Sequence, residues 1–187
     1  MQDTYKKMIR EEHPLHTFRF CPVCGKEGFE ENDWKSKRCP HCGFIYYHNP
    51  ATATAALIEN EAGELLVVRR AREPALGTLD LPGGFCDSGE TAEEGVVREI
   101  REETGLETKV ERFLFSLPNV YRYEGFDVHT LDLFFLCRVK CTKSAKASDD
   151  ASETMWLPWS EIRAEAFGLT SIRKGIEQIL TKKNHYK

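Results

Sequence analysis

Residues 84–106 read GFCDSGETAEEGVVREIREETGL, and this stretch determines how the rest of the chain is interpreted. Glu99, Glu102 and Glu103 occupy positions i, i+3 and i+4, which share one face of an α-helix at 3.6 residues per turn. Like charges at this spacing repel each other and destabilise the helix. A hard divalent cation such as Mg2+ removes that repulsion by binding the carboxylate oxygens, and it also pairs with phosphate. The stretch therefore predicts a helical metal site for a phosphate-bearing ligand.

The same stretch carries signals for the start and end of the helix. Thr91 with Glu94 three residues later forms a capping box, and Gly105 suits a left-handed C-cap. The apolar stripe expected to face the core consists of Val96, Val97 and Ile100. The glutamate face lies roughly 100° around the helix from this stripe, at about 100° per residue. It therefore borders the core, which suits a half-buried metal site.

The stretch resembles the Nudix box, which reads G-x5-E-x7-R-E-U-x-E-E-x-G-U with U bulky and apolar. The fixed positions are all filled here, by Gly84, Glu90, Arg98, Glu99, Ile100, Glu102, Glu103, Gly105 and Leu106. So many matches are far more specific than a lone glycine motif. The resemblance implies the α/β (α+β) class, a Nudix α/β/α sandwich with a mixed sheet, and cleavage of nucleoside diphosphates linked to another group.

The resemblance also implies roles for residues of the box. The implied ligands of Mg2+, with Mn2+ as the alternative ion, are the carboxylates of Glu90, Glu99, Glu102 and Glu103 and the backbone carbonyl of Gly84. Glu90 lies just before the helix, where it could bind a second metal or instead fix the loop. Glu99, Glu102 and Glu103 are implied as catalytic, and Arg98 as an orienting catalytic residue. A salt-bridged surface helix is the simpler alternative, because Glu94–Arg98 and Arg98–Glu102 are i, i+4 pairs. The complete box favours catalysis.

Residues outside the box are candidates for the general base. Glu153 precedes a Thr-Met-Trp segment that resembles the late Glu-x-x-Trp strand of the family. Asp149 and Asp150 are nearby alternatives. Each of these acids could instead be an ordinary solvated side chain on the surface.

Three further residues are candidates for substrate binding. Arg70 lies in the lead into the box and could contact a phosphate. Tyr121 and Tyr123 follow the box and could stack on a base, although a tyrosine on a strand is usually packed against its neighbours. The pairs Cys21/Cys24 and Cys39/Cys42 could form a zinc ribbon before the box, and a zinc ribbon before a Nudix domain is similar to bacterial NADH pyrophosphatases. That subfamily has Ser-Gln-Pro-Trp-Pro-Phe-Pro where residues 116–121 here read Ser-Leu-Pro-Asn-Val-Tyr.

A second motif lies near the amino terminus. Cys21-Pro-Val-Cys24 and Cys39-Pro-His-Cys42 are two knuckles whose four thiolates could bind Zn2+ tetrahedrally. A set of four cysteines has no open position, so the predicted zinc is structural. The alternative is four buried or redox-active cysteines. A module of this size has too small a core to be stable alone, so the metal would supply folding energy.

Length and composition set the domain organisation of the 187-residue chain. We expect a polar lead over residues 1–17, the zinc ribbon over 18–48 and the Nudix domain over 49–187. A net charge of -4 gives no overall attraction to nucleic acid or to an anionic membrane. There is no apolar run of the ~20 residues that cross a bilayer and no apolar signal core. With seven cysteines, an odd number, we expect reduced thiols in a cytoplasmic protein.

Periodicity predicts the remaining elements of the Nudix domain. The expected strands cover residues 52–58, 65–70, 109–117, 130–140 and 154–157, the expected helices 160–165 and 171–182, and a polar loop 143–152. The run TLDLFFLCRV is long and apolar, which indicates a central strand.

These observations together predict a Mg2+-dependent pyrophosphohydrolase in which water attacks one phosphorus of a nucleoside diphosphate derivative. ADP-ribose, NAD(H), FAD and dinucleoside polyphosphates are the candidate substrates. The alternative is a nucleotide-sensing or nucleic-acid-binding regulator on the same fold, and removal of a nucleotide cap from RNA is a third possibility. A homodimer is also possible, with Phe113, Phe115, Phe134 and Phe135 in the core or at the interface.

Overall fold

A computed structural model of the chain describes residues 13–123, 125–139 and 151–182. The chain divides into two compact units, Met1–Asn49 and Pro50–Lys187, each of which is described by itself. The candidate bases Asp149 and Asp150 lie outside the described residues, as does most of the predicted polar loop.

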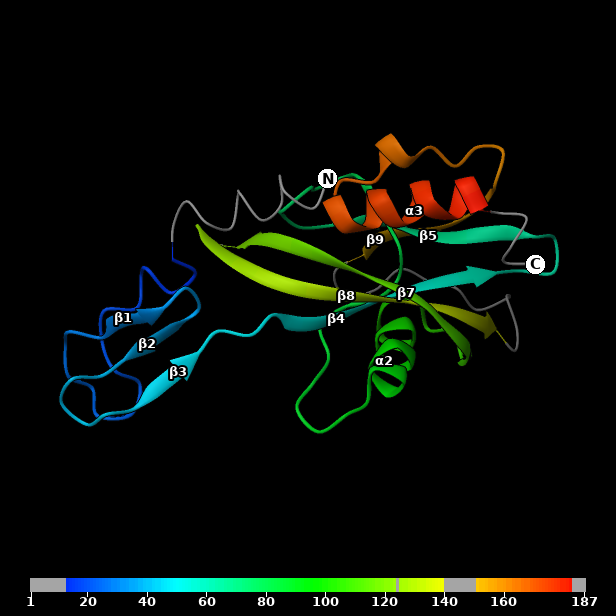
Figure 1. The fold of residues 1–187 in the computed structure, drawn as a ribbon. Coiled ribbons are helices and arrows are strands. Elements are labelled where there is room, and N and C mark those ends of the chain that lie inside the picture. Colours follow the sequence, from blue (N-terminus) through cyan, green and yellow to red (C-terminus); the bar gives the residue numbers. More distant parts are fainter. Residues whose placement is uncertain (1–12, 124, 140–150, 183–187) are drawn as a thin grey trace. The chain divides into compact units, whose positions relative to one another are not determined.

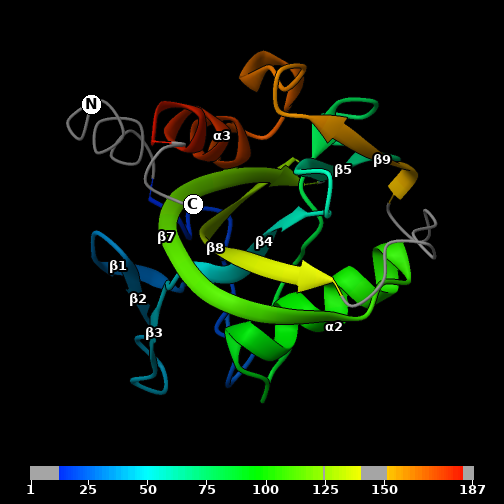
Figure 2. The same ribbon diagram turned by 90° about the vertical axis from the view of Figure 1, so that its right-hand side faces the viewer.

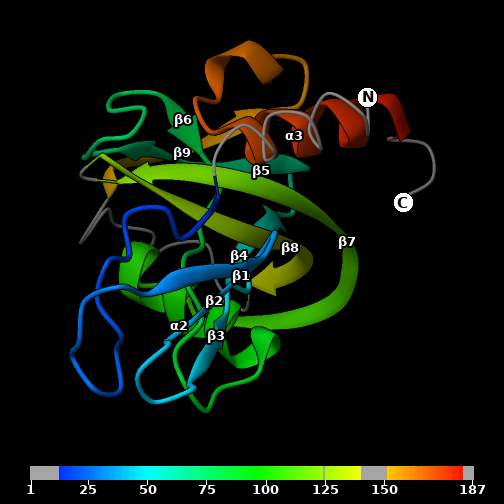
Figure 3. The same ribbon diagram turned by 60° about the vertical axis from the view of Figure 1, so that its left-hand side comes forward.

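The first unit contains a small antiparallel sheet (Figure 3). Its strands are paired in the order β1 (Glu30–Asp33), β2 (Ser36–Arg38) and β3 (Ile45–Tyr47). The buried side chains of this unit cluster around Cys21, Phe29 and Cys39. Because this cluster is so small, apolar burial alone contributes little to the stability of the unit.

The second unit is built on a six-stranded mixed sheet (Figure 1). Five strands are paired in the order β6-β5-β4-β8-β7, and β9 pairs with β5. The strands are β4 (Ala51–Glu59), β5 (Glu64–Arg70), β6 (Leu79–Asp80), β7 (Thr108–Tyr123), β8 (Phe126–Val139) and β9 (Ala151–Pro158). Strands β4 and β8 are parallel, whereas the other pairs are antiparallel. The expected central strand is β8, which lies between β4 and β7.

Helices cover both faces of this sheet, which gives the expected α/β/α sandwich (Figure 2). Successive residues of a strand point to opposite faces, so Phe134 and Phe135 of β8 lie in two different apolar clusters. The Phe134 cluster is covered by α3 (Thr170–Lys182) and the Phe135 cluster by α2 (Ala92–Thr104). Burial of both faces explains why β8 reads as a continuous apolar run.

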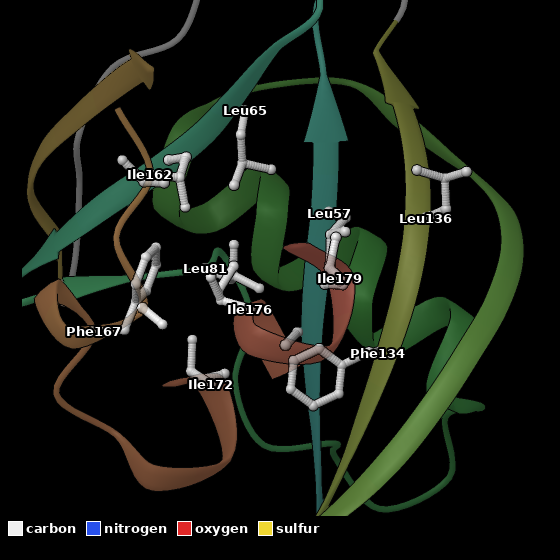
Figure 4. Close-up of a cluster of buried hydrophobic side chains, with 13 residues drawn as sticks. Leu57, Leu65, Leu81, Phe134, Leu136, Ile162, Phe167, Ile172, Ile176 and Ile179 are labelled. Atoms are coloured by element: carbon white, nitrogen blue, oxygen red, sulfur yellow. The ribbon is translucent and has the colours of Figure 1, made fainter. Parts of the chain in front are cut away.

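The α3 side of the core confirms the inward face predicted for the last helix (Figure 4). Ile172, Ile176 and Ile179 are buried against Phe134, and Leu180 packs against the same cluster while partly exposed. The phenylalanines singled out in the sequence divide by position: Phe134 and Phe135 are buried, Phe115 packs against the α3-side cluster, and Phe113 is 49% exposed.

The sheet has a gap that the loop before α2 fills. Strands β4 and β5 have a single residue pair in register, Glu59 with Leu65. Further along β4, the loop takes the place of a neighbouring strand. The Ala56 N–H donates to the Pro82 carbonyl and the Thr54 N–H to the Gly84 carbonyl, both at 2.8 Å. The path of this loop through the sheet positions the candidate active site.

The predicted elements differ from the structure mainly in extent, and one differs in type. Strand β8 begins at Phe126 rather than at residue 130, and β9 spans Ala151–Pro158 rather than residues 154–157, so it includes the last residues of the predicted loop. Strand β7 runs through Pro118, beyond the expected end at residue 117. Because β7 is at the edge of the sheet, the missing N–H of proline removes no ladder bond to a further strand. The helix expected over residues 160–165 is a turn followed by a 3-10 helix, η1 (Ala164–Ala166). The hydrogen bonds of η1, such as the one from the Phe167 N–H to the Ala164 carbonyl, span three residues rather than four.

Helix α2 begins and ends as the sequence predicts. The Thr91 hydroxyl accepts from the Glu94 N–H, while the Glu94 carboxylate accepts from the Thr91 N–H. Gly105 ends the helix at φ 70°. Glu94 therefore caps the helix and does not form the pair with Arg98 that a salt-bridged surface helix would use.

We predict that Gly175→Ala destabilises the protein, although an alanine ordinarily stabilises a helix interior by about 1 kcal/mol. A Cβ at position 175 of α3 would lie 2.5 Å from Cε1 of Phe134. We expect this overlap to lower the free energy of unfolding by about 1–3 kcal/mol, measured by denaturant titration. The double variant Phe134→Leu, Gly175→Ala should lose less than the sum of the two single changes. Wild-type stability of the single Gly175→Ala variant would contradict this close packing.

Candidate active site

The site is organised around two glycines at which the loop passes between β4 and α2. A Cβ on Gly83, whose φ is 147°, would lie 2.2 Å from the Thr54 carbonyl oxygen. A Cβ on Gly84 would lie 2.6 Å from the carboxyl carbon of Glu99. A side chain on either residue would displace the backbone or the glutamate, so only glycine permits this approach.

The three glutamates of α2 differ in their environment. Glu103 is 9% exposed, and its Oε2 accepts a 3.0 Å hydrogen bond from the Gly83 N–H. Glu99 is half-buried, and burial raises the pKa of its carboxyl although Arg98 opposes the effect. Glu102 is the most exposed of the three. The face therefore borders the core at Glu99 and Glu103 and opens to solvent at Glu102.

Arg98 joins most of the acidic groups of the box. Its guanidinium donates to Glu90 at 2.8 and 3.2 Å, to Glu99 at 2.8 Å and to Glu102 at 3.0 Å. The same side chain donates to the Phe85 carbonyl at 3.0 Å. The hydrogen bonds that Arg98 donates to Glu90, then those to Glu99, raise the pKa of Arg98 well above its usual range. The planar guanidinium of Arg98 thus holds three carboxylates and the loop backbone together.

Glu90 is fixed from three sides just before the helix. Its Oε1 accepts from the Asp87 N–H at 2.6 Å as well as from Arg98. A Cβ on Gly95 would lie 2.9 Å from the same oxygen, so the glycine lets the carboxylate lie against the helix. The hydrogen bonds from Arg98 lower the pKa of Glu90. Glu90 thus ties the loop to α2.

The box supplies oxygen donors of the kind that a hard divalent cation prefers. Among the described residues, Oε2 of Glu99 accepts no hydrogen bond, and the glycine loop lies directly against that carboxylate. The box carboxylates converge on Arg98, however, and within the described part of the chain the four cysteines alone have ligand atoms grouped for a metal. The Gly84 carbonyl already accepts from Thr54. These oxygen donors fit Mg2+ or Mn2+, and the Arg98 guanidinium would compete with such an ion for the same carboxylates.

A cavity of about 140 Å³ opens beside the glycine loop. Gly83, Gly84 and Glu103 lie on its wall, together with Arg70 and Tyr121. The structure thus brings two predicted substrate-binding residues to the same space as the box. The guanidinium of Arg70 is already engaged, at 2.7 Å from the Asp80 carboxylate and 2.7 Å from the Pro74 carbonyl.

The other two predicted residues lie away from this cavity wall. Tyr123 is 56% exposed and stacks on Tyr121 with ring centroids 6.4 Å apart. Glu153 does not line the cavity; it is half-exposed on β9, and its Oε2 accepts from Nε of Arg69 at 3.1 Å. Its role as general base stays a prediction.

Several polar residues of the cavity wall were not among the site residues predicted from the sequence. Asp80, Asn119 and Asp132 are 7%, 4% and 6% exposed. Asp132 had a readable signal, since it is the one charged residue within the apolar run TLDLFFLC. Asn119 and Asp80 had no such signal in the sequence. Isolated polar residues in turns and strands are usually exposed, so nothing marked these two as part of a cavity wall.

The four cysteines of the first unit come together as the two knuckles predict. The Sγ atoms of Cys21 and Cys42 are 3.7 Å apart, and those of Cys24 and Cys39 are 3.6 Å apart. Tetrahedral Zn2+ with Zn–S bonds of about 2.3 Å places its sulfurs about 3.8 Å apart. Gly25 and Gly43, with positive φ, follow the knuckles. The cluster therefore has the dimensions of a zinc site with four thiolate ligands.

Comparison with known proteins identifies the family. A family model described as the NUDIX domain matches residues 49–178. The chain therefore belongs to the Nudix family, and hydrolases, including pyrophosphatases, are among its relatives. The fold and the box geometry agree with this assignment.

Individual relatives differ in how much of the chain they match. An ADP-ribose pyrophosphatase of Methanocaldococcus jannaschii is 39% identical over 132 residues, which cover 70% of this chain and 74% of that protein. The NAD-capped RNA hydrolase NudC of Photobacterium profundum is 27% identical over 168 residues, or 90% of this chain and 60% of that protein. The chain thus spans less than two thirds of this NudC relative.

A solved structure shares the fold. A NUDIX hydrolase from Nitrosomonas europaea has a TM-score of 0.73 at 23% identity, covering 90% of this chain and 94% of that chain. At this identity the similarity shows the fold alone. In the part of the chain that the structure describes, no helix has the length and apolar character needed to cross a membrane.

We predict that Arg98→Lys lowers stability even without added metal. A lysine ammonium cannot reach Glu90, Glu99 and Glu102 together, so the partly buried Glu90 and Glu99 lose charge-assisted hydrogen bonds. We expect a loss of about 1–3 kcal/mol in the free energy of unfolding, measured in a chelator. The matched control is Arg101→Lys, at an exposed position of the same helix, which should change little. Equal stability of both variants would show that the Arg98 network contributes nothing.

Proposed function

We propose that the protein is a Mg2+- or Mn2+-dependent pyrophosphohydrolase that cleaves the diphosphate of a nucleoside diphosphate derivative, with ADP-ribose as the first candidate. One observation carries the proposal. The Gly83–Gly84 backbone is held against the carboxylates of Glu99 and Glu103 at the wall of a cavity large enough for one part of a nucleotide. In this proposal the cation ligands lie beside the space that takes the substrate.

The residues of α2 would hold the cation. Glu99 and Glu103 are the principal ligands in this proposal, with Glu102 on the solvent side and Glu90 and the Gly84 carbonyl as further donors. A bound divalent cation would neutralise phosphate charge and lower the pKa of the attacking water. Arg98 holds the carboxylates in place before the cation binds, because its guanidinium already spans three of them.

The reaction consumes one water for each diphosphate. The water oxygen forms a bond to one phosphorus, and the bridging P–O bond to the other phosphate breaks. ADP-ribose would give AMP and ribose 5-phosphate, and no covalent enzyme intermediate is needed. Glu153 is the hypothetical general base. It is half-exposed and paired with Arg69, so attack by the cation-activated water without a general base is the alternative.

The choice of substrate is supported by the relatives. The ADP-ribose pyrophosphatase matches with the higher identity, whereas the NudC similarity extends over more of the chain. NAD(H) and NAD-capped RNA are therefore the second candidates. A nucleotide-sensing regulator remains the alternative from another class, and the intact set of box glutamates favours catalysis over it.

We predict that Glu103→Gln lowers Mg2+-dependent turnover of the preferred diphosphate at least about 100-fold, because one anionic ligand is removed from the cation. The glutamine oxygen can still accept from the Gly83 N–H, so the fold should survive. Turnover is measured by mass detection of the products from ADP-ribose, NADH, FAD and a dinucleoside polyphosphate. The matched control is Glu93→Gln on the exposed side of α2.

Two results would count against this proposal. Full activity of the Glu103→Gln variant would remove the metal-ligand role of that carboxylate. Tight binding of ADP-ribose without hydrolysis in Mg2+ or Mn2+ would favour the regulator.

We further propose that Cys21, Cys24, Cys39 and Cys42 hold a structural Zn2+, supported by the sulfur separations. All four positions are thiols, so no site is left open for catalysis. A reducing compartment such as the cytoplasm would keep these thiols available.

The zinc proposal predicts about one Zn2+ per purified chain by elemental analysis, lost in the Cys39→Ser variant. Because metal binding supplies folding energy to a unit with so small a core, we expect residues 13–49 to lose protection from proteolysis in that variant. Cys86→Ser, outside the cluster, is the control that should retain zinc. Wild-type protein without zinc after purification in its presence would disprove the site.

A further inference from the structure

The cavity beside the box has a polar inner wall that the proposed hydrolysis does not use. Asn119 of β7 lies directly opposite Thr130 of β8, so their side chains share one face of the sheet. The Thr130 hydroxyl donates to Oδ1 of Asp132 at 2.6 Å, and the Ser171 hydroxyl of α3 donates to Oδ2 of the same residue. Asn119, Thr130 and Asp132 all line the cavity.

Asn119 stands out in this group because its side-chain amide has no hydrogen bond among the described residues, although the residue is only 4% exposed. A buried amide without a partner ordinarily costs stability. In the described part of the chain, the one fully enclosed polar side-chain atom without a partner is the Thr108 hydroxyl, elsewhere in the domain. The Asn119 amide therefore faces the cavity, where a ligand or water can satisfy it.

The charges around this end of the cavity indicate what kind of ligand fits. Asp80 and Asp132 contribute two carboxylates, and the guanidinium of Arg70 is already paired with Asp80. Because Arg70 neutralises Asp80 while Asp132 has no cationic partner among these wall residues, the wall keeps a negative charge that disfavours phosphate. The ring of Tyr121 and the apolar side chain of Ile172 also line the space, which suits a flat ring.

The volume of the cavity limits the enclosed part of the ligand to one chemical group of the substrate. The cavity measures about 140 Å³, whereas pockets that enclose a whole drug-sized ligand measure about 300–1,000 Å³. A single base fits this space better than a dinucleotide. The amide of asparagine offers a donor beside an acceptor, which matches the amino group and ring nitrogen on one edge of adenine.

We propose that the inner end of this cavity binds the amino-bearing base of the substrate, adenine in ADP-ribose, and that Asn119 determines the preference for that base. This inference rests on the proposed function, since it names the recognition of the same substrate. The amide donates to ring nitrogen N7 and accepts from the exocyclic amine, and on this edge hypoxanthine would present two acceptors instead. The diphosphate then extends past Gly83 toward Glu99 and Glu103.

The test compares ADP-ribose with its hypoxanthine analogue, in which a carbonyl replaces the exocyclic amine. We expect the wild type to favour ADP-ribose about 10- to 100-fold in kcat/KM. Asn119→Ala should raise KM for ADP-ribose about tenfold, leave kcat largely unchanged and remove the preference. Val120→Ala is the matched control, because the next residue on a strand points to the other face.

Direct binding separates this inference from the proposed function. Calorimetry with AMP and IMP, without metal, tests the base site whether or not the enzyme turns over. We expect tighter binding of AMP, lost in Asn119→Ala but kept in Val120→Ala. Equal affinity for the two nucleotides, or no binding of either, would overturn the base site. Failure of hydrolysis with AMP selectivity intact would overturn only the proposed catalysis.

The thermal stability of the Asn119→Ala variant separates a role in ligand binding from a role in the fold. Because the free Asn119 amide has no partner among the described residues, Asn119→Ala should not lower Tm in the absence of nucleotide. A drop of several degrees would show that the amide serves the fold, and the proposal would then be wrong.

Discussion

The passage of the Gly83–Gly84 backbone between β4 and α2 is the constraint on which the rest of the domain depends. At Gly83 the chain comes so close to the Thr54 carbonyl that a methyl group would overlap it, and at Gly84 it lies against Glu99. The loop also replaces a strand beside β4, so the sheet remains hydrogen-bonded across its gap. One segment thus completes the sheet and sets the distance between the helix carboxylates and the cavity.

The guanidinium of Arg98 relieves the electrostatic repulsion among the glutamates of α2 even without a bound metal. Arg98 spans Glu90, Glu99 and Glu102, whereas Glu103 is satisfied by a backbone N–H of the glycine loop. This explains how a crowded acidic face folds stably, since each carboxylate near the core has a positively polarised partner. A divalent cation bound at these carboxylates would have to share or displace the same partners.

Different interactions stabilise the two units. The second buries apolar side chains on both faces of a six-stranded sheet, which is sufficient for a domain of its size. The first has a small cluster around Cys21, Phe29 and Cys39, and its thiols lie at separations suited to a tetrahedral metal. A cross-link through a metal can compensate for a core that is too small.

The sequence by itself determined the family, helix α2 with both caps, the central strand β8 and the pairing of the cysteine knuckles, because these depend on local spacing and periodicity. It gave the wrong type of structure for residues 160–165 and ended β7 too early, since edge position and docking onto the core override local signals. Only the tertiary structure placed Asn119 beside Asp132 at one end of a cavity, and only it separated Glu153 from that cavity. Such placements depend on strand register across distant segments, and no local pattern in the chain encodes that register.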